Sequence, residues 1–358
     1  MKKVRVGILG ATGMVGQRFV TLLENHPYFD VTVLAASKRN EGKTYEEAVE
    51  GRWKLELPIP EYAKKMKLRV VTEVESVAKD VDFVFSAVDM NKDEIRAFEE
   101  AYAKAEVIVV SNNSAHRWTK DVPMILPEVN SDHLEVVEAQ KKRLGTKRGF
   151  IVVKPNCSIQ SYAPVIAALK EFKPTRAVVT TYQAISGAGK NFESWPEMVG
   201  NVIPYIGGEE EKSEKEPLKI LGHVEDGQIV NATEPMITCQ CVRVPVLDGH
   251  TAAVFIDFEK KPTKEQILEA MKNYRGEPQE LNLPHAPKQF IHYFEEDNRP
   301  QVALDVDLEG GMAISIGRMR EDTMFDYKFI GLSHNTLRGA AGGGLLSAEL
   351  LYAKGYFN

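Results

Sequence analysis

A cysteine lies where the pattern of the chain changes from strand to helix. The β-branched run 151–153 ends shortly before Asn156 and Cys157, and the following sequence, SIQSYAPVIAALKEF, is typical of a helix. The first turn of a helix has unpaired N–H groups and the positive end of the helix dipole, and both favour a thiolate. Asn156 could also donate a hydrogen bond to an oxyanion. We therefore predict that Cys157 is a nucleophile, although most free cysteines are small buried hydrophobic residues.

A second segment, CVRVPVLDGHTAAVF, could supply a base and an anion clamp. A two-residue hairpin turn at Asp248 and Gly249 would pair Leu247 with His250. Period-two alternation along the strand would then place Arg243 on the same face as His250. Four strand residues span about 13 Å, a separation that a long arginine side chain can narrow around a small carboxylate. We expect Arg243 and His250 to face one pocket.

The other two cysteines, Cys239 and Cys241, fall in a strand-like segment, and we interpret them as inert. Three cysteines do not make a disulfide framework. The sequence also has no CxxC pair and no HExxH motif, so we predict no metal site.

The composition limits the classes of protein to which the chain can belong. With 358 residues, of which 43% are hydrophobic and 27% charged, the chain can form two domains with buried cores. A net charge of −6 argues against a nucleic-acid partner, because phosphate backbones attract basic surfaces. No segment approaches the roughly 18 apolar residues of a membrane span, and the first residues contain no small-residue cleavage site. We therefore expect a cytoplasmic protein without a membrane partner.

A glycine-rich turn near the start of the chain predicts a dinucleotide site. Apolar runs at 4–10 and 31–37 flank a segment of helical periodicity at 14–26, and together they make a βαβ unit. Glycines at such a turn let a pyrophosphate approach the helix N-terminus, although the spacing here is GxxGxxG rather than GxGxxG. The residues that we expect to contact the dinucleotide are Gly10, Thr12, Gly13, Met14, Val15 and Gly16.

The end of the second predicted strand indicates which dinucleotide binds. An NAD site usually places an acidic residue there to bind the ribose 2′-hydroxyl, whereas a 2′-phosphate needs cations and hydroxyl donors. The sequence has Ser37, Lys38 and Arg39 at this point and no acid before Glu41. We therefore predict NADP rather than NAD; the alternative is that Lys38 and Arg39 are solvated loop charges.

The order of the predicted elements indicates an α/β protein with two domains. Strands and helices alternate up to residue 153 and predict a Rossmann-like parallel sheet. Beyond Arg176 a mainly antiparallel sheet is expected, with strand-like runs at 177–184, 236–247, 251–258, 288–294, 301–306, 312–319 and 325–332. A small-residue helix is expected at 339–354. We assign 1–156 plus 335–358 to the NADP-binding domain and 157–334 to an α+β catalytic domain.

A thiolate beside a nicotinamide indicates aldehyde chemistry through a thioester. The residues together resemble aspartate-β-semialdehyde dehydrogenase, a family that makes aspartate semialdehyde from aspartyl phosphate on the way to lysine, threonine and methionine. The segments that carry the resemblance are GATGMVGQRF, SNNSAHRW, PNCS, TYQAISGAGK, EEEK, CVRVPVLDGH and HNTLRGAAGGG. NNSAHRW and SGAGK are more similar to the archaeal and fungal branch than to the common bacterial one. The resemblance implies an NADP-dependent homodimer or homotetramer with the sheet of the second domain at the interface.

The resemblance also implies roles for individual residues. Cys157 is similar to the acylated nucleophile, His250 to the general acid/base, and Gln183 to the residue that orients the substrate and acyl intermediate. Arg243 resembles the clamp on the substrate α-carboxylate, and Glu209 the partner of the amino group. The residues that resemble phosphate-binding groups are Arg117 and Lys212, with Asn156 beside them, and those that resemble nicotinamide contacts are Ser186, Gly187 and Asn335.

Other functions stay open at the level of the sequence. A relative with the same fold could reduce a coenzyme A thioester such as malonyl-CoA. A second relative with a different substrate is N-acetylglutamyl phosphate reductase. Neither of these substrates has a free amino group, so Glu209 and Lys212 favour the aspartyl substrate. A regulatory protein that binds NADP and senses its redox state without catalysis would not need a nucleophile, an acid/base and an arginine clamp together. The run EEEKSEKE (209–216) could equally be a solvated helix face, and Arg117 a stacked surface cation.

Overall fold

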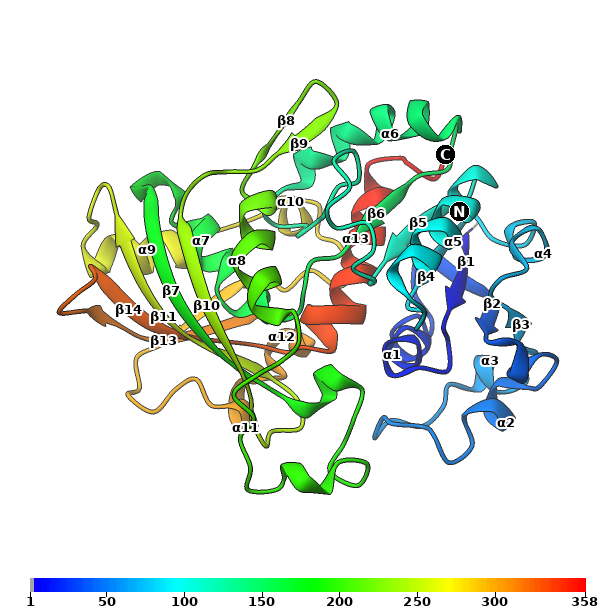
Figure 1. Ribbon diagram of the computed structural model, residues 1–358, viewed down its shortest axis with the longest axis horizontal. Coiled ribbons are helices and arrows are strands. Elements are labelled where there is room, and N and C mark those ends of the chain that lie inside the picture. The colour runs from blue at the N-terminus through cyan, green and yellow to red at the C-terminus, as the bar shows by residue number, and fades with distance from the viewer. Residues whose placement is uncertain (1–2) are drawn as a thin grey trace.

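The computed structural model describes residues 3–358, which form two six-stranded sheets on either side of a central helix (Figure 1). The first sheet is entirely parallel, with the strand order β3-β2-β1-β4-β5-β6. Its strands are β1 (Val4–Leu9), β2 (Phe29–Ala36), β3 (Arg69–Val70), β4 (Phe83–Ser86), β5 (Ile108–Ser111) and β6 (Ile151–Val153). This order, which reverses between β1 and β4, is that of a doubly wound dinucleotide-binding sheet. The predicted Rossmann-like fold is confirmed.

The parallel strands are mostly apolar because both faces of their sheet are covered. Phe98 and Tyr102 of α5 belong to the core on one face, and Phe19 of α1 and Leu345 of the last helix to the core on the other. The helices of this part of the chain are α1 (Met14–Leu22), α2 (Tyr45–Val49), α3 (Glu61–Lys64), α4 (Val74–Ala78), α5 (Lys92–Lys104) and α6 (Val137–Leu144). Among residues 3–358, no helix has both the length and the apolar composition that crossing a membrane requires.

The second sheet is mixed, with the strand order β10-β7-β11-β14-β13-β12. Three of its pairs are antiparallel, as expected, but β7 with β10 and β12 with β13 are parallel. The strands are β7 (Pro174–Gln183), β10 (Met236–Arg243), β11 (His250–Phe258), β12 (Ile291–Phe294), β13 (Ile314–Glu321) and β14 (Tyr327–Ser333), and β8 (His223–Glu225) and β9 (Gln228–Val230) form a separate hairpin. The helices are α7 (Ala163–Ala168), α8 (Glu209–Ile220), α9 (Lys264–Asn273), α10 (Glu277–Glu280), α11 (Val302–Asp305) and α12 (Leu308–Gly311).

The hairpin predicted at Asp248 and Gly249 is wrong. β10 and β11 are not neighbours, because β7 lies between them and pairs with both. The segment between β10 and β11 instead crosses the end of β7, where Ile185 and Ser186 donate backbone hydrogen bonds to the carbonyls of Val246 and Leu247. An Asp-Gly pair fits a tight turn in any loop, so this local signal could not determine which strand is adjacent.

The strand predicted at 301–306 is also wrong, since this segment forms the helix α11. The alternating apolar residues imitate a strand, but the N–H groups of Leu304 and Asp305 donate to the Gln301 carbonyl and close a helical turn. The Asp305 carboxylate accepts from the Gln301 N–H at 2.7 Å and binds Arg299. These side-chain contacts stabilise the turn, and alternation alone does not reveal them.

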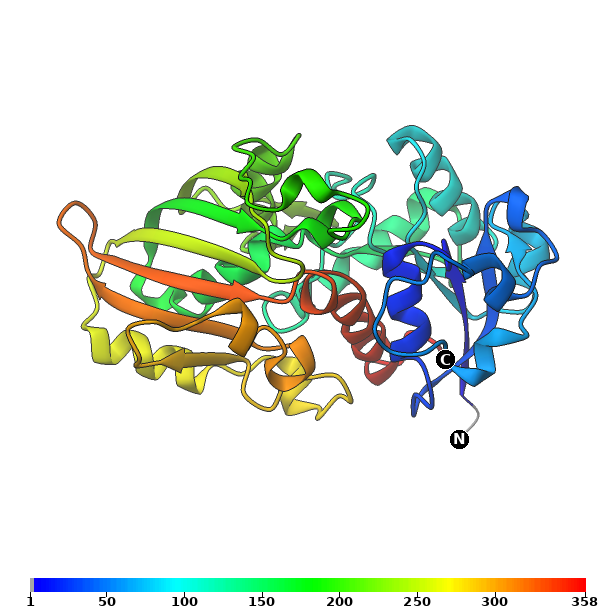
Figure 2. The same cartoon turned by 90° about the horizontal axis from the view of Figure 1, so that it is seen from below.

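The last helix, α13 (Gly342–Ala353), runs between the two sheets and follows the π-helical turn η7 (Leu337–Ala341) (Figures 1 and 2). Every residue from 342 to 351 is buried, as expected for a helix with apolar and small residues on all sides. A Cβ at Gly344 would lie 3.0 Å from the Phe19 ring, so the helix packs closely on α1 of the first domain. The domain limits themselves stay predictions.

Candidate active site

Cys157 and His250 meet between the two sheets. The chain leaves β6 and turns at Cys157 into the 3₁₀ turn η3 (Ser158–Ser161), while His250 is the first residue of β11. Cys157 Sγ lies 3.4 Å from His250 Nε2. A thiol and an imidazole in contact can share a proton, which is the arrangement of a nucleophile with its acid/base.

The surroundings of His250 keep its imidazole neutral. The side chain is fully buried, and Nδ1 accepts a 3.0 Å hydrogen bond from the Ala184 N–H. Burial lowers the pKa of His250 to about 3, and the positive charge of Arg243 adds to this effect. Because Nδ1 accepts from Ala184, we assign the proton of the neutral ring to Nε2, the atom that faces Cys157. His250 is therefore oriented to donate toward the sulfur.

The thiol of Cys157 is harder to ionise than its place in the sequence indicates. Cys157 does not open an α-helix but caps a turn of four residues, which has little dipole. Burial and the carboxylate of Glu209 raise the pKa of Cys157 to about 11. The charges that act in the opposite direction are those of Lys154, Arg117 and Arg243. The expectation that a helix N-terminus activates the thiol is therefore wrong, and the thiolate depends on nearby cations.

Arg243 and Gln183 lie next to the reactive pair. They are register partners at the ends of β10 and β7, and both are buried. Arg243 Nη1 donates a 2.6 Å hydrogen bond to the Ala184 carbonyl. A Cβ on Gly187 would lie 3.1 Å from Arg243 Nη1 and 3.2 Å from His250 Nε2. The backbone at Gly187 therefore lies against both side chains, and the glycine leaves the space between them open.

A second group of predicted residues surrounds Glu209, in the first turn of α8. Glu209 Oε1 accepts hydrogen bonds from Asn156 Nδ2 at 3.1 Å and from Lys212 Nζ at 2.7 Å. Asn156 Oδ1 accepts from the Ser158 N–H at 2.7 Å, so its amide group is held on both sides. A carboxylate and an ammonium group near Cys157 could bind the opposite charges of an amino-acid phosphate.

The structure adds Glu216 and Lys154 to the site. Arg117 Nη1 donates to Glu216 Oε1 at 2.9 Å, and Arg117 Nε donates to the Lys154 carbonyl at 3.0 Å. The other oxygen of Glu216 accepts from the Asn156 N–H at 2.5 Å, so the buried pair of Arg117 and Glu216 holds the backbone just before Cys157. The sequence contains a signal for Glu216, because it follows Glu209 by seven residues and so lies on the same helix face. The contact of Arg117 with a substrate phosphate stays a prediction.

Two predicted nicotinamide contacts, Ser186 and Asn335, are hydrogen bonded to each other. Asn335 Nδ2 donates to Ser186 Oγ at 2.8 Å, and Asn335 Oδ1 accepts from the Gly249 N–H at 2.7 Å. Ser186 Oγ donates to Asp248 Oδ1 at 2.6 Å, and the second carboxylate oxygen of Asp248 lies 3.7 Å from Arg18 Nη2 in α1. Sequence reasoning used Asp248 only as a turn signal. In the structure it links the loop before β11 to the helix of the glycine-rich turn.

The glycine-rich turn has a shape that suits a dinucleotide. Gly10 has φ +86°, and a Cβ there would lie 2.3 Å from the Ala87 carbonyl oxygen. No side chain caps α1, which begins after Gly13, so its first N–H groups can face an anion. The three residues expected to bind a 2′-phosphate are exposed directly after β2, namely Ser37, Lys38 and Arg39. The cofactor contacts of the individual residues stay predictions.

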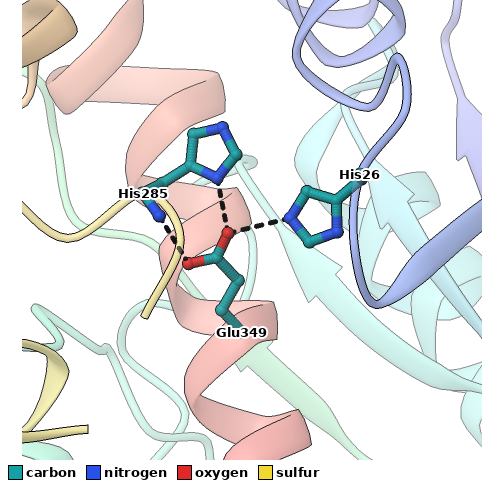
Figure 3. A group of neighbouring side chains, drawn as sticks. All are labelled: His26, His285 and Glu349. Atoms are coloured by element: carbon teal, nitrogen blue, oxygen red, sulfur yellow. Dashed lines mark hydrogen bonds and ion pairs between the residues drawn. The ribbon is translucent and has the colours of Figure 1, made fainter. Parts of the chain in front are cut away.

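Among residues 3–358, one group has the composition of a metal site: His26, His285 and Glu349 (Figure 3). Glu349 Oε1 accepts from His26 Nε2 at 2.9 Å and from His285 Nδ1 at 2.5 Å. Burial opposes ionisation of Glu349, but these hydrogen bonds lower its pKa. The Tyr28 N–H donates to His26 Nδ1 at 3.2 Å, which assigns the ring proton to Nε2. A protonated Nε2 cannot bind a metal, so we interpret the group as a hydrogen-bonded anchor for α13. The expected absence of a metal stays a prediction.

The parallel sheet with its glycine-rich turn, joined to a domain that places a cysteine against a histidine, defines a two-domain dehydrogenase. Two family models match the chain in the same order. The model described as "Semialdehyde dehydrogenase, NAD binding domain" matches residues 5–137, and the one described as "Semialdehyde dehydrogenase, dimerisation domain" matches residues 163–338.

Relatives that match along the whole chain identify the family. The chain is 43% identical to aspartate-semialdehyde dehydrogenase of Methanothermobacter thermautotrophicus, over 97% of this chain and 99% of the relative. It is 42% identical to that of Saccharomyces cerevisiae, over 99% and 98% respectively. The structure of aspartate semialdehyde dehydrogenase with NADP from Candida albicans matches with a TM-score of 0.89 at 37% identity, over 99% of this chain and 100% of that chain. The chain therefore belongs to the aspartate-semialdehyde dehydrogenase family, which confirms the resemblance and its archaeal and fungal character.

Proposed function

We propose that this chain catalyses the reversible, NADP-dependent reductive dephosphorylation of L-4-aspartyl phosphate to L-aspartate 4-semialdehyde. The observation that carries the proposal is the 3.4 Å contact of Cys157 Sγ with His250 Nε2. Membership of the family supports this reaction over others that a cysteine and a nicotinamide could perform together. In this role the enzyme contributes to lysine, threonine and methionine biosynthesis.

Cys157 forms and breaks the covalent bond to the substrate. Its thiolate attacks the acyl carbon of aspartyl phosphate, and inorganic phosphate leaves with the electron pair of the broken C–O bond, which gives a thioester. The thioester on Cys157 is reduced to a thiohemiacetal by a hydride, which NADPH would supply when bound. Collapse of the thiohemiacetal releases the aldehyde and restores the thiolate. His250 Nε2 is placed to hold the proton that moves between the sulfur and the oxygen of each tetrahedral intermediate.

The charged side chains around Cys157 match the charges of the substrate. Arg243 uses only part of its planar guanidinium on the Ala184 carbonyl and can bind the α-carboxylate with the rest. Glu209 would accept from the substrate ammonium group, with Asn156 beside it. Gln183, at the end of β7, would orient the acyl group. The residues assigned to the phosphate are Lys212 and Arg117.

The preference for NADP depends on the exposed residues after β2. A 2′-phosphate would be bound by Ser37, Lys38 and Arg39, while Ser186, Gly187 and Asn335 would contact the nicotinamide end. Replacing Lys38 and Arg39 by alanine should lower the ratio of kcat/KM for NADP to that for NAD about tenfold or more, mainly through KM, because two charged hydrogen bonds are lost. Equal use of both cofactors by the unmodified enzyme would contradict the assignment.

A substrate panel at fixed enzyme concentration tests the reaction. Phosphate-dependent reduction of NADP⁺ with aspartate semialdehyde is expected. The alternative, reduction of a coenzyme A thioester, would appear as oxidation of NADPH with malonyl-CoA. A protein that binds NADP but turns over neither substrate would be a regulator instead.

We also propose that a second copy of the chain covers the open face of the mixed sheet, to give a homodimer or a homotetramer. The dimerisation-domain match supports this, as does the outward face of the sheet, where Tyr182 is 39% exposed and Val178 and Phe255 are partly exposed. Light scattering should give a mass of at least two chains, and Tyr182→Glu should lower it. A monomer at micromolar concentration would contradict the proposal. The cytoplasmic location stays a prediction that cell fractionation can test.

A further inference from the structure

Lys154 lies three residues before the nucleophile, and protein encloses its ammonium group. The residue is 3% exposed, and Nζ donates a 2.8 Å hydrogen bond to the Pro155 carbonyl. An ammonium group has three donors, so one neutral acceptor does not replace the hydration that the charge loses. Burial accordingly lowers the pKa of Lys154 to about 7. The cost of burying this charge is greatest when no anion lies near it.

Two glycines after β14 bring Lys154 and Cys157 to one surface. A Cβ at Gly339 would lie 2.7 Å from Cys157 Cβ, and a Cβ at Gly343 would lie 2.9 Å from Lys154 Cε. The two glycines are four residues apart, which is about one helical turn or 6 Å. The two side chains therefore contact neighbouring turns of the same helical segment, and the glycine-rich sequence makes room for both.

Charges from several elements act on the two groups. The charged groups that influence the pKa of Lys154 are Cys157, Arg117, Arg338 and Glu216. Those that act on Cys157 come from Glu209, Lys154, Arg117 and Arg243, and His250 is in direct contact with its sulfur. Arg117 and Arg338 disfavour a charged Lys154, and an ionised Cys157 favours it. In the other direction, Lys154 has the largest favourable effect on the Cys157 thiolate.

We propose that Lys154 is the counter-charge of the Cys157 thiolate, so that ionisation of the thiol is accompanied by protonation of the lysine. The Sγ–H bond breaks, Nζ gains a proton, and two neutral groups become an ion pair without net exchange of protons with solvent. Lys154 is then a positioning residue that acts through Cys157. The inference rests on the proposed role of Cys157 as the nucleophile.

The rate at which iodoacetamide alkylates Cys157 tests this coupling when it is measured against pH, with the modified peptide identified by mass spectrometry. Below about pH 7 Lys154 is already charged, so ionising Cys157 releases one proton and the rate should rise tenfold per pH unit. Above about pH 7 the lysine takes up the proton, so the rate should become level before it rises again at alkaline pH. The unmodified enzyme is therefore expected to show a plateau.

Lys154→Met should remove the plateau, because a methionine side chain of similar length cannot be protonated. The rate should then rise tenfold per pH unit throughout, and at pH 7 it should be at least about tenfold below that of the unmodified enzyme. Lys154→Arg retains a permanent charge at this position. This variant should restore the rate at pH 7 but show a single titration without a plateau.

Lys219 offers a matched control. It is also a buried lysine with a lowered pKa, about 8, but its Nζ donates to the carbonyls of Arg117, Thr119 and Val122. Lys219→Met should lower the melting temperature and leave the shape of the alkylation profile unchanged.

The proposal is overturned if the unmodified enzyme shows a single titration of unit slope with no plateau, a result that needs no variant. It is also overturned if folded Lys154→Met alkylates with the profile of the unmodified enzyme. Failure to reduce NADP⁺ with aspartate semialdehyde would instead contradict the proposed function, since alkylation does not depend on the identity of the substrate.

Discussion

Cys157 lies between the two sheets, 3.4 Å from His250, whereas Cys239 and Cys241 lie along β10 with their Sγ atoms 3.8 Å apart. The shifts in the pKa values of these three thiols have unexpected directions. Burial raises the pKa of Cys157, while a hydrogen bond from Cys239 lowers that of Cys241 and in turn raises that of Cys239. The thiol that is assigned to catalysis is therefore not the one that its surroundings ionise most readily.

Cys157 and Cys241 differ in solvent exposure and in the side chains that surround them. Cys241 is fully buried in the core beneath α8, and its polar neighbours include the Ser213 hydroxyl at 3.6 Å and Cys239. Cys157 is partly exposed and has an imidazole in contact and cations around it. Nucleophilic catalysis needs a substrate within reach and a group that moves its protons, and a low pKa replaces neither.

The largest effect should follow from Cys157→Ser. A serine hydroxyl is far less ionised at neutral pH, so kcat should fall by at least about 10⁴-fold, while the fold and NADP binding remain. Mass spectrometry of the unmodified enzyme with an acyl-phosphate or aldehyde substrate should find the adduct in the 151–170 region. Full activity of Cys157→Ser, or an adduct on Cys239 or Cys241, would contradict the assignment of Cys157 as the nucleophile.

His250→Ala tests whether contact with His250, the assigned acid/base, is what distinguishes Cys157 from Cys239 and Cys241. The variant should lose about 10²- to 10⁴-fold in kcat, the usual contribution of general acid/base catalysis. It should still be alkylated at Cys157, because the sulfur and its access remain. Loss of alkylation together with turnover would show that His250 acts on the accessibility or structure of the site.

Arg243→Lys tests a residue that lies two positions after Cys241 on β10 but is assigned to the substrate of Cys157. An ammonium group cannot reproduce the planar two-point contact with a carboxylate. KM for aspartate semialdehyde should therefore rise about tenfold or more, with a smaller change in kcat. Initial rates over a range of substrate concentrations measure both constants, and an unchanged KM would remove Arg243 from its assigned role.

The smallest effect is expected from Cys241→Ala. Loss of the buried sulfur should reduce the free energy of unfolding by about 1–2 kcal/mol, as measured by denaturant titration. Because no substrate reaches this thiol, kcat/KM should stay within about twofold of the unmodified value. A large loss of activity at unchanged stability would show that Cys241 has a chemical role, which its burial does not explain.

Local patterns were sufficient to predict much of this protein from its sequence. The βαβ unit, the glycine-rich turn and the position of Cys157 after β6 follow from periodicity and turn chemistry within about 30 residues. Arg243 and His250 were expected to face one pocket, and the structure brings both against Gly187. The expected hairpin was wrong because β7, some 60 residues earlier in the chain, lies between their strands. Strand alternation determines which face a side chain takes, but not which strand lies beside it.

The tertiary structure alone decided the electrostatics of the site. The tautomer of His250 depends on the Ala184 N–H, the position of the backbone before Cys157 on Glu216, and the room for Lys154 on Gly343. These partners are 60 or more residues apart in the chain. Sequence spacing can identify a side chain able to act as nucleophile, base or cation. Its pKa, however, is set by desolvation and by charges that only folding brings close, because both effects depend on distance in space.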